Sequence, residues 1–290
     1  MATPDRKVIE MEENRGSAGY IPYQPAFEQM LHYRNFTVPP GHPLYGIVSD
    51  FYQFDSVSAD GGVCVIPDGC MDLLFRYGDG TVVKTLEGYH RRKVMVPVNQ
   101  IGSAFGVRFV PGELANLVPM QSSELIGKHA PLTDFLKRDP LLDRMDELQD
   151  FEQRVETISA YLIKLIQNSR DTADIVRYCT DKIIGSRGNV HIGELSEDTG
   201  YSVRYLRVLY HRYVGVSPKE FCEIIRFQHS FYEYSLQKRA NKDFSLCDFA
   251  IQGGYYDQSH MNKSYRRIAG ALPGKLFSEV SRQDSVPPVR

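Results

Sequence analysis

Residues 202–218 read SVRYLRVLYHRYVGVSP, and residues 257–273 repeat their pattern as DQSHMNKSYRRIAGALP, 55 residues further along the chain. The matched pairs are Leu206 with Met261, Tyr210 with Tyr265, Tyr213 with Ile268, Gly215 with Gly270, Pro218 with Pro273 and Phe221 with Leu276. In each copy the apolar residues recur at helical spacing after a glycine turn, Gly200-Tyr201 or Gly254-Tyr255. This pattern predicts a helix-turn-helix unit that the chain uses twice.

Local signals fix the ends of the predicted helices. Ser202 and Asp257 are good N-caps for the second helix of each unit, and Ser245 with Asp248 has the form of a capping box. An uninterrupted helix is predicted between the units, from Ser217 to Leu236, with Pro218 in its first turn. Such a helix is roughly 27 to 30 Å long at ~1.5 Å per residue, which is close to the ~34 Å turn of B-DNA. One monomer can therefore reach two adjacent major-groove segments.

The faces opposite the apolar stripes indicate what these units bind. No acidic residue occurs in 202–213 or in 258–270. A helix face that is merely solvated normally mixes both charge signs, so two such faces at equivalent positions favour a polyanion. Arg and Lys suit guanine edges, and Asn and Gln suit adenine. The predicted DNA-contacting residues are Arg204, Arg207, Val208, His211 and Arg212 in the first unit, and Gln258, Ser259, Asn262, Lys263, Arg266 and Arg267 in the second.

These residues also carry a family resemblance. The pattern comprises Ile192-Gly-Glu-Leu195, Gly200-Tyr-Ser202, Leu206, Tyr210, Gly215-Val-Ser-Pro218, Ala250, Gly254-Tyr255, Asp257-Gln-Ser259, Met261, Tyr265 and Gly270-Ala-Leu-Pro273. It resembles the DNA-binding domain of AraC/XylS-type transcription regulators over Asp174 to Glu279. The resemblance implies that Arg204, Arg207, Val208, Gln258, Ser259 and Lys263 contact bases. Ser196, Tyr255, Met261 and Leu272 depart from the usual family residues without removing a packing function.

The charge is distributed unevenly along the chain, although its net value is only −2. Residues 1–170 hold 17 Lys/Arg and 22 Asp/Glu, a balance of −5, whereas residues 171–290 hold 17 and 14, a balance of +3. The helix-turn-helix half is thus the basic half, as expected for a protein that binds DNA.

Other classes of protein find little support in the sequence. The five cysteines (Cys64, Cys70, Cys179, Cys222 and Cys247) are scattered without a CxxC pair, so we expect neither a disulfide framework nor a zinc site. No cofactor fingerprint, signal peptide or membrane-spanning apolar stretch occurs. We therefore expect a cytoplasmic protein that needs no cofactor.

The N-terminal half has the composition of an antiparallel sheet. We predict strands at 47–55, 62–66, 71–77, 81–88 and 101–109, with turns at 59–62, 67–69 and 78–80. Residues 1–20 are expected to be flexible, and the proline-rich residues 20–46 to be extended without regular structure. Ile66 to Phe75, followed by Gly106 to Gly112, resembles a poorly characterised module that precedes the DNA-binding domain in some AraC-type regulators.

Helices are predicted after this sheet, at 113–119, 131–136 and 151–168. The last helix has one apolar face, which we interpret as core or, alternatively, as the seam of a homodimer. That face comprises Val155, Ile158, Leu162, Leu165 and Ile166. A polar linker is predicted at 168–172. The expected α+β architecture is therefore a β-rich effector or dimerisation domain (21–168) and a separable, all-α DNA-binding domain (174–285).

Two functional hypotheses follow. We favour a sequence-specific transcription regulator, an activator rather than an enzyme, with double-stranded DNA, RNA polymerase and a small-molecule effector as partners. The alternative is a DNA-targeted enzyme centred on Cys70 or on Asp68 and Asp72, with Glu113 as a further acid. For Cys70 we favour the interpretation as a small buried side chain. For the basic run His90-Arg91-Arg92-Lys93 we favour a solvated loop over an anion-binding site.

Overall fold

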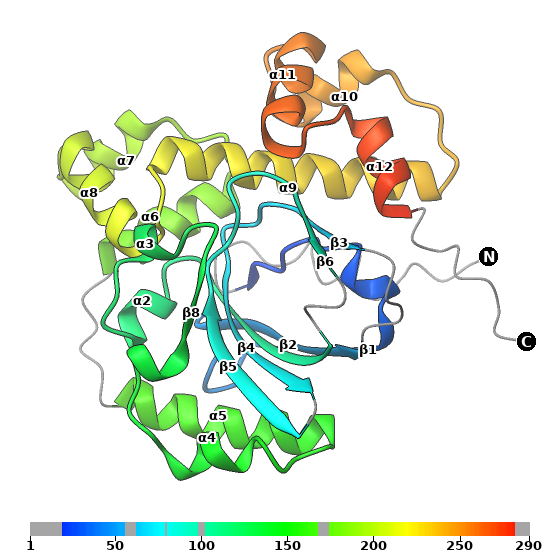
Figure 1. The fold of residues 1–290 in the computed structure, drawn as a ribbon. Coiled ribbons are helices and arrows are strands. Elements are labelled where there is room, and N and C mark those ends of the chain that lie inside the picture. The colour runs from blue at the N-terminus through cyan, green and yellow to red at the C-terminus, as the bar shows by residue number, and fades with distance from the viewer. Residues whose placement is uncertain (1–18, 56–61, 79, 98–101, 168–173, 282–290) are drawn as a thin grey trace, which may run out of the picture.

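The computed structural model describes residues 19–55, 62–78, 80–97, 102–167 and 174–281. Within these residues a β-rich N-terminal half precedes an all-helical C-terminal half, which confirms the expected α+β class (Figure 1). The predicted linker at 168–172 and all but the last two residues of the predicted flexible N-terminus lie outside the described residues.

The N-terminal half is built on a six-stranded antiparallel sheet with the strand order β1-β2-β7-β4-β5-β8. Its strands are β1 (Leu31–Thr37), β2 (Val48–Asp55), β4 (Met71–Gly78), β5 (Thr81–Glu87), β7 (Ser103–Phe109) and β8 (His129–Pro131). A separate two-stranded sheet pairs β3 (Gly62–Val65) with β6 (Val94–Pro97). The five predicted strands are therefore confirmed to within two residues at each end.

Three strands were not predicted. β1 lies in the stretch that we expected to be irregular, and that expectation is wrong there. β1 forms an edge of the sheet and its side chains are exposed or half-buried, so its sequence lacks the alternation that marks a half-buried strand. β6 and β8 are only four and three residues long, too short to show any period.

The alternation of side chains divides the six-stranded sheet into two unlike faces. On β4 and β7 the residues Leu73, Phe75, Phe105 and Val107 point into the larger hydrophobic core. Asp72, Leu74 and Arg108, one position out of phase, project from the opposite face together with Tyr52 of β2. The β3–β6 sheet and the short 3-10 helix η2 (Phe27–Gln29) help to enclose this second face, and a cavity remains between them.

Short helices follow the sheet: α2 (Leu114–Leu117), α3 (Ser122–Leu125) and α4 (Pro140–Arg144). The helix predicted at 131–136 is wrong, because Pro131 pairs with Thr85 in the β5–β8 ladder and only the 3-10 turn η4 (Leu132–Asp134) follows. The long helix is confirmed as α5 (Phe151–Gln167). Its Ile158 and Leu162 are fully buried in the larger core, so the dimer-seam interpretation is wrong for these two residues.

Substituting Glu for Leu162 should therefore unfold the N-terminal half rather than dissociate a dimer. Leu162 is 1% exposed, and a carboxylate there would be buried without a partner. We expect a loss of several kcal/mol and a clear fall in melting temperature. Ala160→Glu, on the exposed side of the same helix, is the matched control and should melt like the wild type. A folded Leu162→Glu protein with half the wild-type mass in light scattering would restore the dimer seam.

The C-terminal half contains the two predicted helix-turn-helix units. α6 (Asp174–Gly185) leads into the first unit, α7 (Ile192–Thr199) and α8 (Val203–Tyr213), and α12 (Pro273–Ser281) follows the second, α10 (Leu246–Gln252) and α11 (Gln258–Ala269). Every predicted cap is confirmed: the side chains of Ser202, Ser245 and Asp257 accept hydrogen bonds from the backbone N–H groups of Tyr205, Asp248 and His260. Between the units lies α9 (Pro218–Arg239), whose 22 residues make a rod roughly 33 Å long (Figure 1).

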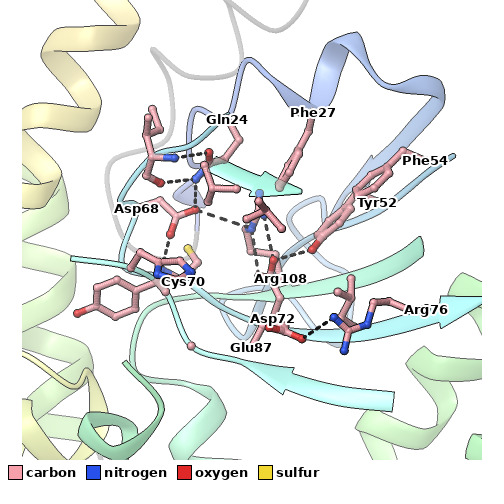
Figure 2. Close-up of a pocket in the computed structure, with 17 residues that line it drawn as sticks. Gln24, Phe27, Tyr52, Phe54, Asp68, Cys70, Asp72, Arg76, Glu87 and Arg108 are labelled. Carbon is pink, nitrogen blue, oxygen red and sulfur yellow. Dashed lines mark hydrogen bonds and ion pairs between the residues drawn. The ribbon is translucent and has the colours of Figure 1, made fainter. Parts of the chain in front are cut away.

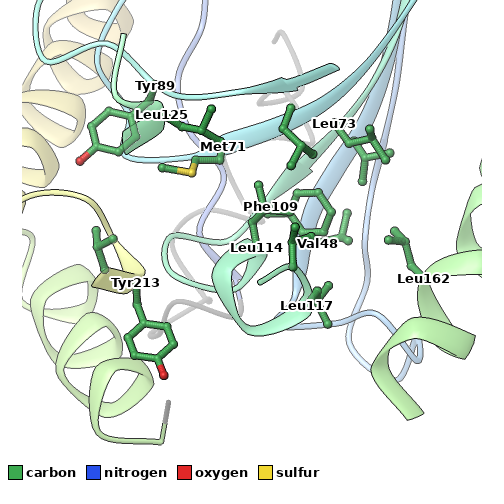
Figure 3. Packing of buried hydrophobic residues seen from close by; sticks show 14 of the residues in the cluster. Val48, Met71, Leu73, Tyr89, Phe109, Leu114, Leu117, Leu125, Leu162 and Tyr213 are labelled. Atoms are coloured by element: carbon green, nitrogen blue, oxygen red, sulfur yellow. The ribbon is translucent and has the colours of Figure 1, made fainter. Parts of the chain in front are cut away.

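The two halves share their hydrophobic cores. The larger cluster joins Phe105 and Leu114 of the N-terminal half to Leu206 and Tyr213 of α8. Figure 3 shows this cluster reaching from Tyr213 on α8 to Leu162 on α5. The second cluster joins Tyr52 and Phe54 to Phe227 and Phe231 of α9 and to Tyr265 of α11. The separability of the two halves stays a prediction, and any test of it must account for this shared apolar surface.

Candidate nucleic-acid interface and buried cavity

The predicted DNA-contacting side chains lie on the outer faces of α8 and α11. Each helix is held by its buried stripe, which is Leu206, Tyr210 and Tyr213 in α8 and Met261, Tyr265 and Ile268 in α11. The exposed predicted residues are Arg204, Arg207, Val208, His211 and Arg212 on α8, and Ser259, Lys263, Arg266 and Arg267 on α11. Gln258 and Asn262 are half-buried. Both faces are thus open to solvent.

Two of the predicted arginines have partners within the protein. The guanidinium of Arg267 lies 2.7 Å from a carboxylate oxygen of Glu223 on α9, so part of its charge is already neutralised. The guanidinium of Arg212 lies 5.3 Å from the centre of the Tyr213 ring. Arg267 should accordingly contribute less than Arg212 to the attraction of phosphates.

Exposed tyrosines at the starts of these helices are a feature that the sequence analysis missed. Tyr201 and Tyr256 occupy equivalent positions of the two units, just before the N-caps, and both are exposed. The Tyr201 ring also stacks on the Tyr205 ring, with 5.0 Å between the ring centres. The sequence does contain a signal for this feature: a tyrosine recurs at the same position of both units, outside the buried stripe.

A cavity that is partly open to solvent lies on the second face of the six-stranded sheet. It has a volume of about 130 Å³ and is lined by residues of β2, β4, β7, β3, β6 and η2. Most of its wall is apolar, formed by Phe27, Tyr52, Phe54, Val65, Leu74 and Val96. Tyr52 can lie flat across the sheet only because residue 106 is glycine: a Cβ at Gly106 would be 2.1 Å from the Tyr52 ring. The Tyr52 hydroxyl then donates a hydrogen bond of 2.6 Å to Asp72.

One end of the cavity is strongly polar. Arg108 of the central strand β7 donates to both carboxylate oxygens of Asp72, at 3.1 and 3.0 Å. Its Nε also lies 4.0 Å from Asp68, so that Arg108 sits between the two acids (Figure 2). Asp50 is the register partner of Arg108 on the other neighbouring strand. Asp50, Asp68 and Arg108 are each 5% exposed or less.

Burial changes the protonation of these groups. Desolvation raises the pKa of Asp68 to about 6, although Arg108 acts in the opposite direction. Burial alone would lower the pKa of Arg108, but the carboxylates of Asp72 and Asp50 outweigh it and hold that pKa above its usual value. Arg108 therefore stays charged at neutral pH, while the pKa of Asp68 is only about one unit below neutral pH.

The cavity wall is connected directly to the DNA-binding half. The Gln24 side chain donates to Asp68 at 2.8 Å, inside the cavity. The neighbouring Tyr23 N–H donates to the buried Gln228 side chain of α9 at 2.8 Å. Gln228 in turn donates to the carbonyl of Pro67 at 2.7 Å, next to Asp68. Hydrogen bonds thus connect the surroundings of Asp68 to the helix that joins the two units.

The N-terminal half also contacts both helices of the predicted interface at their C-terminal ends. The Ser122 hydroxyl donates to the carbonyl of Tyr213 at 2.6 Å, and the Lys93 N–H donates to the carbonyl of Ile268 at 2.8 Å. Tyr213 and Ile268 are the equivalent residues of the repeat. The N-terminal half thereby contacts the same point of each unit and leaves the predicted base-contacting faces open.

Comparisons with known proteins agree with this division of the chain. Residues 195–279 match the family model described as "Helix-turn-helix domain", and residues 36–131 match a "Domain of unknown function (DUF6597)". The HTH-type transcriptional regulator ExsA of Pseudomonas aeruginosa is 29% identical over 84 residues, which are 29% of this chain and 28% of that protein. The C-terminal half is an AraC-type helix-turn-helix domain. The chain matches less than a third of the curated relative's length, so the relative informs this AraC-type domain alone.

Two solved structures of ToxT from Vibrio cholerae have weaker similarity over most of the chain. One is 10% identical with a TM-score of 0.39 and covers 85% of this chain and 96% of its own. The other is 13% identical with a TM-score of 0.37 and covers 86% and 96%. Scores at this level leave the N-terminal half to be interpreted from its own residues.

The structure does not bring the residues of the alternative enzyme centre into a catalytic arrangement around Cys70. The Cys70 side chain is buried, and burial raises the pKa of its thiol, so the thiolate needed for a nucleophile is disfavoured. Asp68 and Asp72 do come together, but Arg108 is bound to them. Glu113 lies elsewhere and binds Arg177 of α6 through two hydrogen bonds of 2.8 and 2.9 Å.

The basic run at 90–93 is not the solvated loop that we expected. Arg91 lies 3.6 Å from Glu220 of α9, and Lys93 forms an ion pair with Glu279 of α12. Together with the Lys93 N–H bond to Ile268, these contacts place the run against the AraC-type domain. Among the described residues no helix is both long and apolar enough to span a membrane, and no cluster of potential ligand side chains fits a metal ion.

Alkylation should separate the cysteines by exposure. Cys247 is exposed, whereas Cys64, Cys70, Cys179 and Cys222 are buried. We expect iodoacetamide to modify one site rapidly in the native protein and all five in denaturant, with peptide mapping assigning the rapid site to Cys247. Labelling of Cys70 at the rate of Cys247 would contradict the buried position and revive the enzymatic alternative.

Proposed function

We propose that the protein is a sequence-specific DNA-binding transcription regulator that inserts α8 and α11 into successive major-groove segments. The observation that carries this proposal is the repeated, acid-free and exposed face of these two helices within the AraC-type domain. The rod of roughly 33 Å between the units agrees with the ~34 Å that separates major-groove segments on one side of B-DNA.

The proposal assigns the N-terminal half to effector sensing. In support, its cavity has an apolar wall and a few convergent polar groups, as small-molecule sites do. The chain from Asp68 through Pro67 to Gln228 supplies a physical connection to α9. Activation of transcription through RNA polymerase, and assembly of a homodimer, stay predictions.

Selection of bound fragments from genomic DNA by the full-length protein tests this function. We expect enriched sites with two half-sites whose centres lie ~10 to 10.5 base pairs apart. A double variant, Arg207→Ala with Lys263→Ala, removes one cation from each face and should lose the enrichment, while Arg138→Ala, an exposed arginine of the N-terminal half, should keep it. Enrichment of a single half-site, or the same enrichment with the double variant, would contradict insertion of both helices.

A further inference from the structure

The cavity on the second face of the sheet has a size that limits its ligand. At about 130 Å³ it is slightly smaller than the ~150 Å³ cavity that accommodates benzene in an engineered protein. The aromatic rings of Phe27, Tyr52 and Phe54 stack against one another along its wall, with 5.5 to 6.0 Å between ring centres. A body of one ring or a few carbons therefore fills this space.

The polar end of the cavity is not electrically balanced. Among the residues that the structure describes, Arg108 is the one cation paired with Asp68 and Asp72, and the register also places Asp50 beside it. The pair Arg76 and Glu87, 3.8 Å apart, lines the cavity as well and balances itself. Even without counting Asp50, one negative charge in excess remains on side chains that are largely buried.

A buried charge in excess is costly, and it can be relieved by a proton or by a cation. Burial, and to a lesser degree the neighbouring Asp72, raises the pKa of Asp68 to about 6, which favours relief by a proton. Relief by a cation is not available from the described side chains of the wall. Arg76 is paired with Glu87, and burial lowers the pKa of His90, which disfavours its charged form. The space beside Asp68 is bordered by aromatic rings, whose faces also attract cations.

We propose that this cavity binds a small organic cation, a protonated amine on a body of about one ring, with its ammonium group hydrogen-bonded at Asp68 and Asp72. The amine donates the hydrogen bonds that the two carboxylates can still accept, and its apolar body lies against Tyr52, Phe54 and Leu74. A carboxylate ligand of the same size is rejected, because Arg108 is already bound by Asp72 and a further anion would face Asp68.

This inference rests on the proposed function only in taking the cavity as the effector site. Binding of an amine is measured on the protein without DNA, and DNA binding is measured without an amine. Failure of one measurement therefore leaves the other standing.

Three probes of nearly equal shape test the charge preference: benzylamine, benzyl alcohol and benzoate, titrated into the full-length protein at pH 7.5 and followed by calorimetry. We expect benzylamine to bind at least about tenfold more tightly than either of the others, a difference of about 1.4 kcal/mol. Asp68→Asn should remove that preference, whereas Glu147→Gln, an exposed carboxylate on the N-terminal half, should keep it.

A second variant locates the site independently of its charges. Leu74→Trp fills the cavity from β4 and should abolish binding of benzylamine, and melting curves establish that each variant is folded. If Asp68→Asn fails to fold, the comparison of the three probes and the Leu74→Trp variant still decide. Equal or tighter binding of benzoate or benzyl alcohol, no binding of any probe at about 10 mM, or benzylamine binding that survives Leu74→Trp would each overturn the proposal.

Discussion

Replacing Arg108 with methionine is expected to destabilise the protein more than any other single change at the cavity. Methionine preserves much of the volume but leaves Asp72 and Asp68 buried without their cation. Breaking a buried ion pair from one side costs about 3 to 5 kcal/mol, a large share of the ~5 to 15 kcal/mol that a typical domain has. We expect a melting temperature lower by roughly 10 °C, since each kcal/mol corresponds to ~2 to 4 °C in a domain of this size.

Arg76→Met is the matched control. Arg76 on β4 carries the same guanidinium group as Arg108 on β7 and projects from the same face of the sheet. The side chain of Arg76 is 24% exposed and its ion pair with Glu87 is 3.8 Å long, whereas that of Arg108 is 6% exposed. We expect a cost of less than about 1 kcal/mol for Arg76→Met. Equal costs for the two variants would mean that the acids around Arg108 are hydrated or already protonated.

The pH dependence of this variant has a definite sign. Without Arg108, which lowers it, the pKa of Asp68 rises further, so the folded variant takes up a proton that the unfolded chain, with an ordinary carboxyl pKa near 4, does not hold. The loss of stability should therefore be largest at pH 7 to 8 and should shrink as the pH falls towards 5. A loss that stays constant over this range would contradict uncompensated charge as its cause.

The helical half could be predicted from sequence because its determinants are local. The caps at Ser202, Ser245 and Asp257 and the buried stripe of each unit depend on residues within four positions of each other. The recurrence of the same pattern 55 residues along the chain then supported the prediction of each unit. Only the end of α9 differed, since Lys238 and Arg239 extend the helix beyond Leu236 without an apolar signal.

The cavity could not be predicted in the same way. Its polar end depends on Asp72 pairing with Arg108, 36 positions apart, and on Asp50 pairing with Arg108 from the other side. Such a register is set by the whole sheet and has no local signature. The position of Arg108 was nevertheless a visible signal in the sequence, because it is the one charged residue of β7 and follows the largely apolar run Ala104 to Val107.

The docking of the two halves was hidden for a related reason. Gln228 and Ser122 look like ordinary polar residues of a helix surface, and only the tertiary structure shows that both are buried and bonded across the junction. The polar linker predicted at 168–172 suggested that the halves are independent. Because they share hydrophobic clusters, their independence has to be tested by experiment.

The largest expected effects on DNA concern the arginines of α8, whose roles should follow from position. Arg207 projects from the exposed face in the N-terminal half of the helix, while Arg212 lies at its C-terminal end beside Tyr213. Base edges are contacted by the N-terminal part of such a helix, and its far end meets the backbone. Arg207→Ala should therefore cost ~1 to 3 kcal/mol at the specific site and relax the base preference there.

Arg212→Ala should instead weaken binding to all sequences about equally and lower the slope of log K against log salt by roughly one. Arg267→Ala should have a smaller effect on that slope, since Glu223 already neutralises part of its charge.

In the second half-site, Gln258 and Ser259 can contact several bases, so that half-site should tolerate more base changes than the first. Binding to a library of single-base operator variants at two salt concentrations measures all three effects. An Arg207→Ala protein with undiminished base preference, or equal penalties in both half-sites, would show that position along the helix does not decide these roles.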